Sequence, residues 1–250
     1  MRLNYVSQGD GPTLVLIHGM YGSASNLRAV SKAFSDRFRV ISMDLRNHGD
    51  SPHQPDMDLA CMAGDVVETL DAINVDMVHI LGHSLGGKIA MQLALNYPQM
   101  ISKLVVADIA PVRYRQTHSD VLDGLIALEN AKIRSRREAD EILSSFESDQ
   151  SVRGFLLTNL VRRDGEEYVL RLNVTAIANN YYDSLMAAPE GEPFTGPTLF
   201  IKGQDSAYIQ EKHRESIGSF FPCADLQVIP GVGHWLHVED PLAFNNMVSH

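Results

Sequence analysis

The feature that most constrains the fold of this chain is the pentapeptide Gly82-His83-Ser84-Leu85-Gly86, which directly follows the apolar run Met77 to Leu81. A helical pattern extends from Leu85 to Asn96, so the serine is expected in a tight turn between a strand and a helix. The two outer glycines lack a Cβ atom at the points where such a strand and helix crowd each other. We therefore predict that Ser84 has a strained backbone conformation, with its hydroxyl clear of the sheet at a helix N-terminus.

The rest of the chain alternates apolar runs with helical patterns. The runs that predict strands are 3–6, 13–17, 39–43, 77–81, 103–109, 198–202 and 224–229. The patterns that predict helices are 26–34, a stretch capped by Asp58, 85–96, 209–217 and a terminal helix from about Pro241. Continuous apolar runs are typical of strands that are buried on both faces of a sheet. The alternation therefore predicts an α/β fold with an open, mostly parallel sheet flanked by helices.

The segment between residues 112 and 194 interrupts this alternation. Helical patterns occur at 121–130, 138–146, 152–160 and 173–186, with a turn at 162–166 and no further strand of the sheet type. We therefore predict an α/β core made of residues 1–111 and 195–250, with an inserted helical cap made of residues 112–194.

Three groups of residues resemble the α/β-hydrolase superfamily. They are Gly82 to Gly87, Leu16-Ile17-His18-Gly19, and Gly233-His234. The loop from Asp44 to Ser51 is similar to the corresponding segment of YbfF-type esterases within that superfamily. The resemblance covers the chain apart from its middle segment and implies an α/β-hydrolase fold. It also implies an oxyanion hole formed by the backbone N–H groups of Leu85 and of Met20, the residue that follows His-Gly.

A serine nucleophile needs a base, and the base works best when a carboxylate fixes its tautomer. The chain contains Ser84, then several acids, then His234 in the loop after the last predicted strand. This is the chain order of serine, acid and histidine in the α/β-hydrolase fold. We therefore predict that Ser84 is the nucleophile and that His234 is its base.

The acid has two candidates. In most of the superfamily it lies after the penultimate strand in a Gly-x-x-Asp pattern, but here that stretch reads Gly203-Gln204-Asp205-Ser206. Asp205 is one place early, and Ser206 occupies the usual position. Asp108 instead ends an apolar run, at the edge of the sheet where ligands bind. We predict that Asp108 orients His234 with Ser206 assisting, and we keep Asp205 as the alternative acid.

The other polar motifs do not predict a metal or cofactor site. His18 could be a base, but its position beside a glycine in a turn favours a structural hydrogen-bonding role. His48, Asp50 and His53 lie in a polar loop without a helical or strand frame, so we predict no metal site there. The glycine-rich stretches lack the βαβ fingerprint of a dinucleotide site, so no cofactor is expected.

Charge and hydropathy exclude two classes of partner. The chain has 21 Lys and Arg against 31 Asp and Glu, a net charge of −10, so nucleic acid is not expected as a partner. The N-terminal residues lack the apolar core of a signal peptide, and no apolar run approaches the length of a membrane span. We expect a cytoplasmic protein with no membrane partner.

Together these features predict a cofactor-free serine hydrolase that cleaves small-molecule carboxylic esters, and the family resemblance adds acyl thioesters such as acyl-CoA. We expect the cap to close over the acyl group and set its size, and basic cap residues could contact a phosphate. These basic residues are Arg134, Arg136, Arg137, Arg162 and Arg163. Two alternatives stay open: a lyase or perhydrolase on the same triad, and a ligand receptor of the same fold that binds without turnover.

Overall fold

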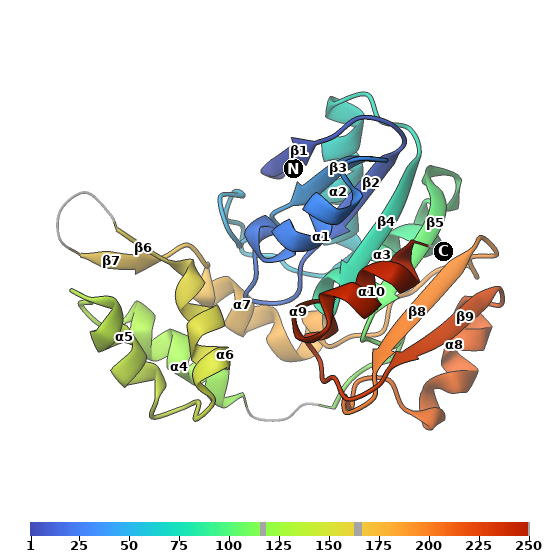
Figure 1. The fold of residues 1–250 in the computed structure, drawn as a ribbon. Helices are drawn as coiled ribbons and strands as arrows, with labels where there is room; N and C mark the ends of the chain where they lie inside the picture. The colour runs from blue at the N-terminus through green and yellow to red at the C-terminus, as the bar shows by residue number, and fades with distance from the viewer. Residues whose placement is uncertain (116–118, 163–166, 250) are drawn as a thin grey trace.

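A computed structural model describes residues 1–115, 119–162 and 167–249 of the 250-residue chain. Its main element is a seven-stranded sheet with the order β1-β3-β2-β4-β5-β8-β9 (Figure 1). The strands are β1 (Tyr5–Gln8), β2 (Thr13–Ile17), β3 (Arg39–Met43), β4 (Val78–His83), β5 (Ile101–Ala107), β8 (Thr198–Gly203) and β9 (Ala224–Ile229). Neighbouring strands are parallel except for β1, which pairs antiparallel with β3. The predicted α/β fold with a mostly parallel sheet is confirmed.

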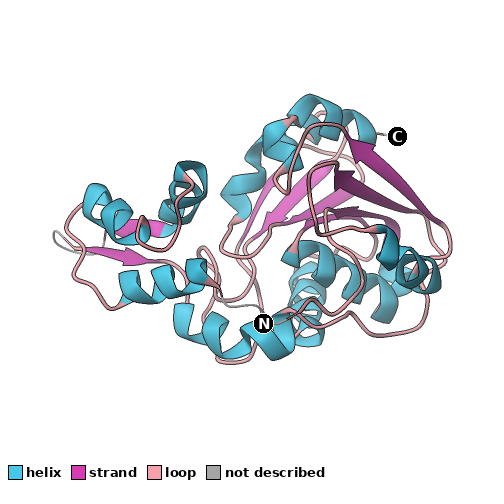
Figure 2. Ribbon diagram, turned by 90° about the horizontal axis from the view of Figure 1, so that it is seen from below, coloured by secondary structure: helices cyan, strands magenta, loops and turns pink. Residues whose placement is uncertain are grey.

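Helices cover both faces of this sheet (Figure 2). One layer contains α2 (Leu59–Ala72), α3 (Leu85–Asn96) and α8 (Arg214–Phe220), and the other contains α1 (Arg28–Phe34), α9 (Leu236–Glu239) and α10 (Pro241–Val248). Because side chains alternate along a strand, Ile80 of β4 packs into the first core and Leu81 into the second. Within the described part of the chain, no helix has both the length and the apolar character needed to cross a membrane.

Most predicted elements have close to their predicted bounds, and the differences have local causes. The first strand begins two residues later than predicted, because the N–H of the buried residue Leu3 donates to Thr69 Oγ1 at 2.9 Å instead of pairing in the sheet. The helix predicted at 209–217 begins only at Arg214, after a 3₁₀ turn. The 3₁₀ turns are η1 (Ala24–Leu27), η2 (Pro98–Met100), η3 (Leu157–Asn159) and η5 (Glu211–His213).

The inserted segment, residues 112–194, leaves the sheet after β5 and returns at β8 (Figure 1). Its elements are α4 (Asp120–Glu129), α5 (Arg136–Leu143), α6 (Gln150–Leu156), β6 (Leu160–Arg162), β7 (Tyr168–Leu170), α7 (Val174–Asn180) and a π-helical turn, η4 (Tyr181–Leu185). The segment is therefore not purely helical, but its two strands, β6 and β7, form a separate two-stranded sheet and do not join the seven-stranded sheet. β6 and β7 form an antiparallel hairpin.

The hairpin has a sequence signal that the helical interpretation missed. Valine and tyrosine favour strands, and the short runs Leu160–Arg162 and Tyr168–Leu170 flank an Asp-Gly pair, a common hairpin signal. Apart from Arg162, the turn predicted at 162–166 lies outside the described residues. Because both runs are short, their strand signal is weaker than the helical pattern that precedes them.

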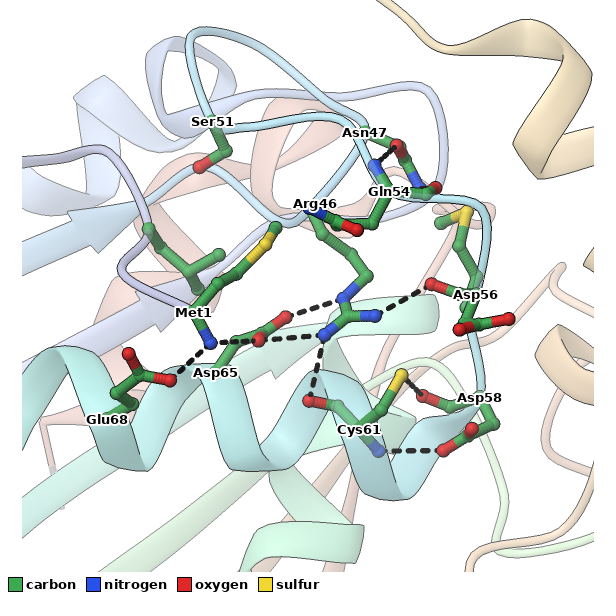
Figure 3. Close-up of polar contacts among 12 residues, drawn as sticks. Met1, Arg46, Asn47, Ser51, Gln54, Asp56, Asp58, Cys61, Asp65 and Glu68 are labelled. Atoms are coloured by element: carbon green, nitrogen blue, oxygen red, sulfur yellow. Dashed lines mark hydrogen bonds and ion pairs between the residues drawn. The ribbon is translucent and has the colours of Figure 1, made fainter.

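A buried ion pair anchors the loop between β3 and α2 to the core (Figure 3). The Arg46 guanidinium donates to both carboxylate oxygens of Asp65 on α2, at 2.6 and 2.8 Å. It also donates to the carbonyl of Asp56 at 2.7 Å, farther along the same loop. Both charged groups are buried, and their direct hydrogen bonds offset the cost of removing the two charges from solvent. The loop therefore has a fixed course beside the strand ends.

Lys88 of α3 ties together the two ends of the inserted segment. Its ammonium donates to the carbonyls of Val112 at 3.1 Å, where the segment begins, and of Met186 at 3.0 Å, near its end. It also donates to the carbonyl of Ala187 and lies over the ring of Tyr114, 4.9 Å from the ring centroid. The residue is 1% exposed, so these carbonyls and the ring replace only part of its hydration shell, and burial still disfavours its charge.

We expect the pH dependence of unfolding to differ between the wild-type protein and Lys88→Met. Burial lowers the pKa of Lys88 from 10.5 to about 7, whereas a lysine in the unfolded chain keeps its ordinary pKa. At pH values between these two pKa values, Lys88 is neutral in the folded protein and charged in the unfolded chain, so unfolding takes up a proton. Raising the pH therefore increases the free energy of unfolding by up to about 1.4 kcal/mol per pH unit. Urea unfolding of both proteins between about pH 7.5 and 9.5 measures this difference in slope. Equal slopes would show that Lys88 titrates normally.

Candidate active site

Ser84 occupies the strained turn that its motif predicts. Its φ and ψ are 54° and −119°, a combination that non-glycine residues rarely adopt, and it directly precedes α3. A Cβ on Gly82 would lie 2.1 Å from the Gly86 carbonyl oxygen, and one on Gly86 would lie 2.3 Å from the Ile17 carbonyl oxygen. Strand, helix and the neighbouring β2 thus approach closely enough that both positions require glycine.

His234 connects the serine to a carboxylate. Its Nε2 lies 3.0 Å from Ser84 Oγ, and its Nδ1 lies 2.7 Å from Asp108 Oδ2. A carboxylate only accepts, so Nδ1 carries the hydrogen and Nε2 is left to accept from the serine hydroxyl. This is the tautomer that a general base requires.

Asp108 is the residue that follows β5, and its side chain is completely buried. Its φ is 52°, a second left-handed non-glycine residue at the strand ends. The carboxylate accepts from the Gly203 N–H at 3.2 Å and from the Ser206 hydroxyl, in addition to His234. These donors replace water around the buried charge.

The two candidate acids therefore differ in burial, because Asp108 is buried and Asp205 is exposed. Asp205 is exposed, and its backbone N–H donates to the Val232 carbonyl at 2.9 Å. The hydroxyl of Ser206, one residue later, donates to the Asp108 carboxylate, and the assisting role of Ser206 stays a prediction. The structure thus brings Ser84, His234, Asp108 and Ser206 together and leaves the Asp205 side chain at the surface.

The sheet order explains why these residues meet. β4 lies between β2 and β5, and β8 and β9 follow beyond β5. Ser84, Asp108, Ser206 and His234 come after β4, β5, β8 and β9 respectively. Since the carboxyl ends of parallel strands lie at one edge, four segments far apart in sequence converge on one site.

The two predicted oxyanion donors border the same cavity as the serine. Leu85 is the first residue of α3, so its backbone N–H has no partner within the helix. Met20 lies in the loop after β2, the strand that pairs with β4. Ser84, Met20 and Leu85 all line the same cavity.

Two buried histidines shape the loop that contains Met20. His18 Nε2 accepts from the Leu45 N–H at 3.0 Å, so its Nδ1–H donates to the Gly19 carbonyl at 2.7 Å. His48 Nε2 accepts from the Tyr21 N–H at 3.2 Å, so its Nδ1–H donates to the Arg46 carbonyl at 2.9 Å. Burial lowers the pKa of His18, and it lowers the pKa of His48 to about 3.

Both histidines are therefore neutral hydrogen-bonding links between two loops. For His18 this is the structural role favoured by its position next to Gly19. The role of His48 was not predicted, because its partner, Tyr21, is distant in sequence. Asp50 pairs with Arg171 at 3.3 Å, and His53 Nε2 donates to the Arg171 carbonyl at 3.2 Å. Among the described residues, no three His, Cys, Asp or Glu side chains are grouped to hold a metal ion.

Two further residues hold His234 in place, and sequence reasoning missed both. His83 Nε2–H donates to the His234 carbonyl at 2.8 Å, and burial lowers the pKa of His83 well below its usual range. The ring of Tyr208 stacks on the imidazole of His234, with 4.0 Å between ring centroids. Stacking restricts the imidazole to one plane, in which its two nitrogens can hydrogen-bond to Ser84 and to Asp108 at the same time.

The serine and histidine border a cavity of about 600 Å³. Much of its wall is apolar and comes from the inserted segment, through Val121, Val152, Phe155, Leu156, Leu185 and Met186. Core residues complete the wall, among them Ile109, Trp235 and Val238. Of the arginines predicted to contact a phosphate, those the structure describes lie outside this lining, and Arg163 is outside the described residues. Arg136, for example, donates to the carbonyls of Leu157 and Leu160.

A mostly parallel sheet with a strained serine after its central strand and a histidine after its last strand defines the α/β-hydrolase class. The family model for the alpha/beta hydrolase fold matches residues 12–241. The chain therefore belongs to the α/β-hydrolase fold family.

Its relatives within this family are similar over nearly the whole chain. It is 38% identical to sn-1-specific diacylglycerol lipase ABHD11 of Danio rerio, over 95% of this chain and 77% of that protein. It is 36% identical to Esterase YbfF of Escherichia coli K12, over 94% of this chain and 91% of that protein. A solved structure described as a marine microorganism esterase superposes with a TM-score of 0.96 and 35% identity, covering 99% of this chain and 98% of the other.

Replacing the two candidate acids separately should have very different effects. Asp108→Asn is expected to lower kcat by up to about 10⁴-fold, because an amide opposite Nδ1 favours the wrong imidazole tautomer. Asp205→Asn should leave kcat within about threefold of wild type, because Asp205 is exposed. Steady-state kinetics on an aryl ester, with circular dichroism to check folding, measures both. A larger loss in Asp205→Asn would overturn the assignment.

Proposed function

We propose that this protein is a carboxylic-ester hydrolase that uses Ser84 as its nucleophile. The observation that carries the proposal is the continuous series of contacts from Ser84 Oγ to His234 and from His234 to the buried Asp108. The names of two relatives, a diacylglycerol lipase and an esterase, support the same reaction class.

In this mechanism His234 Nε2 takes the proton of the Ser84 hydroxyl while Oγ attacks the acyl carbon of the ester. The carbonyl oxygen becomes negatively charged and accepts hydrogen bonds from the N–H groups of Met20 and Leu85. His234 then gives its proton to the alcohol that leaves. A water molecule, deprotonated by His234, releases the acid from Ser84 by the same steps. The Asp108 carboxylate stabilises the imidazolium each time it forms.

The cavity lining indicates the substrate class. Its mostly apolar wall suits an ester with an uncharged, lipophilic chain, and the apolar residues that the inserted segment contributes favour a role for that segment as a cap over this chain. Thioesters can react by the same steps at the same serine. The described arginines give no support to a phosphate contact in the cavity, so we propose lipophilic esters rather than acyl-CoA.

Ser84→Ala is the direct test of this function. We expect it to lower kcat for p-nitrophenyl esters by a factor on the order of 10⁴ or more and to abolish labelling by a fluorophosphonate probe. The fold should be retained, since alanine is smaller and the turn glycines are unchanged. Burst kinetics in the wild type would distinguish the hydrolase from a lyase or a receptor. Activity of the variant within tenfold of wild type would contradict the proposal.

The proposed cap role predicts a change in chain-length selectivity. Val152→Trp on α6 fills part of the cavity, so kcat/KM should fall at least tenfold for octanoyl or longer esters and change little for acetyl esters. Val169→Trp is the matched control, because Val169 is a half-buried residue of β7 outside the cavity lining. Equal effects on acetyl and long-chain esters would contradict a substrate-chain pocket at this place.

A further inference from the structure

Tyr21, the residue after Met20, has a backbone conformation that needs external support. Its φ is 62°, in the left-handed region that a bulky non-glycine side chain rarely adopts. Such conformations persist where surrounding contacts determine them, and they occur often at functional sites. Tyr21 is buried, and both of its backbone polar groups are hydrogen-bonded to side chains from elsewhere in the chain.

The two partners of Tyr21 come from different parts of the molecule. Its N–H donates to His48 of the core, and its carbonyl accepts from Asn159 Nδ2 of the inserted segment at 2.7 Å. Asn159 is 1% exposed, and its Nδ2 also donates to the Leu156 carbonyl at 3.1 Å. The backbone carbonyl of Asn159 in turn accepts from the Arg171 N–H at 2.9 Å, so the backbone that carries this amide is held within its own segment.

A series of hydrogen bonds leads from Asn159 to the proposed oxyanion donor. In a trans peptide unit the C=O and N–H point in opposite directions. The Tyr21 carbonyl belongs to the same unit as the Gly22 N–H, which donates to the Gly19 carbonyl at 3.1 Å. The Gly19 carbonyl belongs to the same unit as the Met20 N–H. Two peptide units thus connect the Asn159 amide to Met20.

We infer that Asn159 is a positioning residue for the oxyanion hole, an inference that rests on the proposed ester-hydrolase function. Its amide fixes the direction of the Tyr21–Gly22 peptide unit, which in turn helps to fix the Gly19–Met20 unit. Hydrogen bonds in such a series also polarise one another, which strengthens the donor at its end. The inserted segment therefore contributes to the rate of the reaction as well as to substrate selection.

Asn159→Asp tests this inference, because it keeps the shape of the side chain and replaces the donating amide nitrogen by an accepting oxygen. We expect kcat to fall by about 10- to 100-fold, less than the 10²- to 10³-fold typical when an oxyanion donor is removed outright. KM for a short ester should change by less than about threefold, because the ground-state carbonyl depends less on the hole. Asn159→Ala should behave similarly.

A trifluoromethyl ketone supplies a readout that a purely structural role would not change. It adds to a nucleophilic serine as an oxyanion, so its inhibition constant should rise by about the same factor by which kcat/KM falls. Asn180→Ala is the matched control. Asn180 also joins the inserted segment to the core, donating to the Pro55 carbonyl at 2.8 Å and accepting from the Met57 N–H at 3.3 Å, and neither of these hydrogen bonds involves the Met20 loop.

The outcomes separate this inference from the proposed function. If Ser84→Ala keeps its activity, the proposed function is wrong. If Ser84→Ala is inactive and Asn159→Asp has wild-type kcat and inhibition constant, only the role of Asn159 is wrong. An equal loss in Asn180→Ala would attribute the effect to general displacement of the inserted segment. Failure of Asn159→Asp to fold at 25 °C would make Asn159 a stability residue and would also overturn the inference.

Discussion

The close approach of β4, α3 and β2 around Ser84 is the constraint on which the rest of the site depends. This close approach requires glycine at positions 82 and 86. It also fixes the Ser84 hydroxyl and the first N–H of α3 in one rigid turn. The proposed nucleophile and one proposed oxyanion donor are thereby positioned by backbone geometry alone. The other groups of the site come from the ends of β2, β5, β8 and β9 at the same edge of the sheet, so the accuracy of the site follows from the register of the sheet.

The central residues of this site could be predicted because each has a local signal. Ser84 has its turn glycines, Asp108 ends an apolar run, and His234 follows a glycine after the last strand. The parallel sheet then brings strand ends to one edge whatever the intervening sequence. The contact between Ser206 and the Asp108 carboxylate could be anticipated from a departure from the usual pattern, because a serine in the usual position of the acid can hydrogen-bond a carboxylate from the neighbouring strand.

The supporting residues could not be predicted in this way, since their roles depend on contacts between distant segments. His48 was considered only as a metal ligand, and its hydrogen bond to Tyr21 becomes visible only when two loops are folded together. Lys88 is a polar residue within a helical pattern, and nothing in that pattern shows that three carbonyls meet its ammonium. The β6–β7 hairpin was missed for a related reason, because short strands outside the main sheet have a weak periodic signal.

The attachment of the inserted segment follows from what a buried polar group requires. Lys88 gathers the carbonyls at both ends of the segment, and Asn159 satisfies the carbonyl of a strained residue beside Met20. An unpaired group in either place would incur the cost of desolvation without a hydrogen bond, about 1–3 kcal/mol for a neutral group. The segment is therefore held at two places. At its ends its buried carbonyls accept hydrogen bonds from Lys88, and at Asn159 it donates a hydrogen bond to the loop that contains Met20. A substitution that loosens it should thus affect substrate selection and the chemical step together.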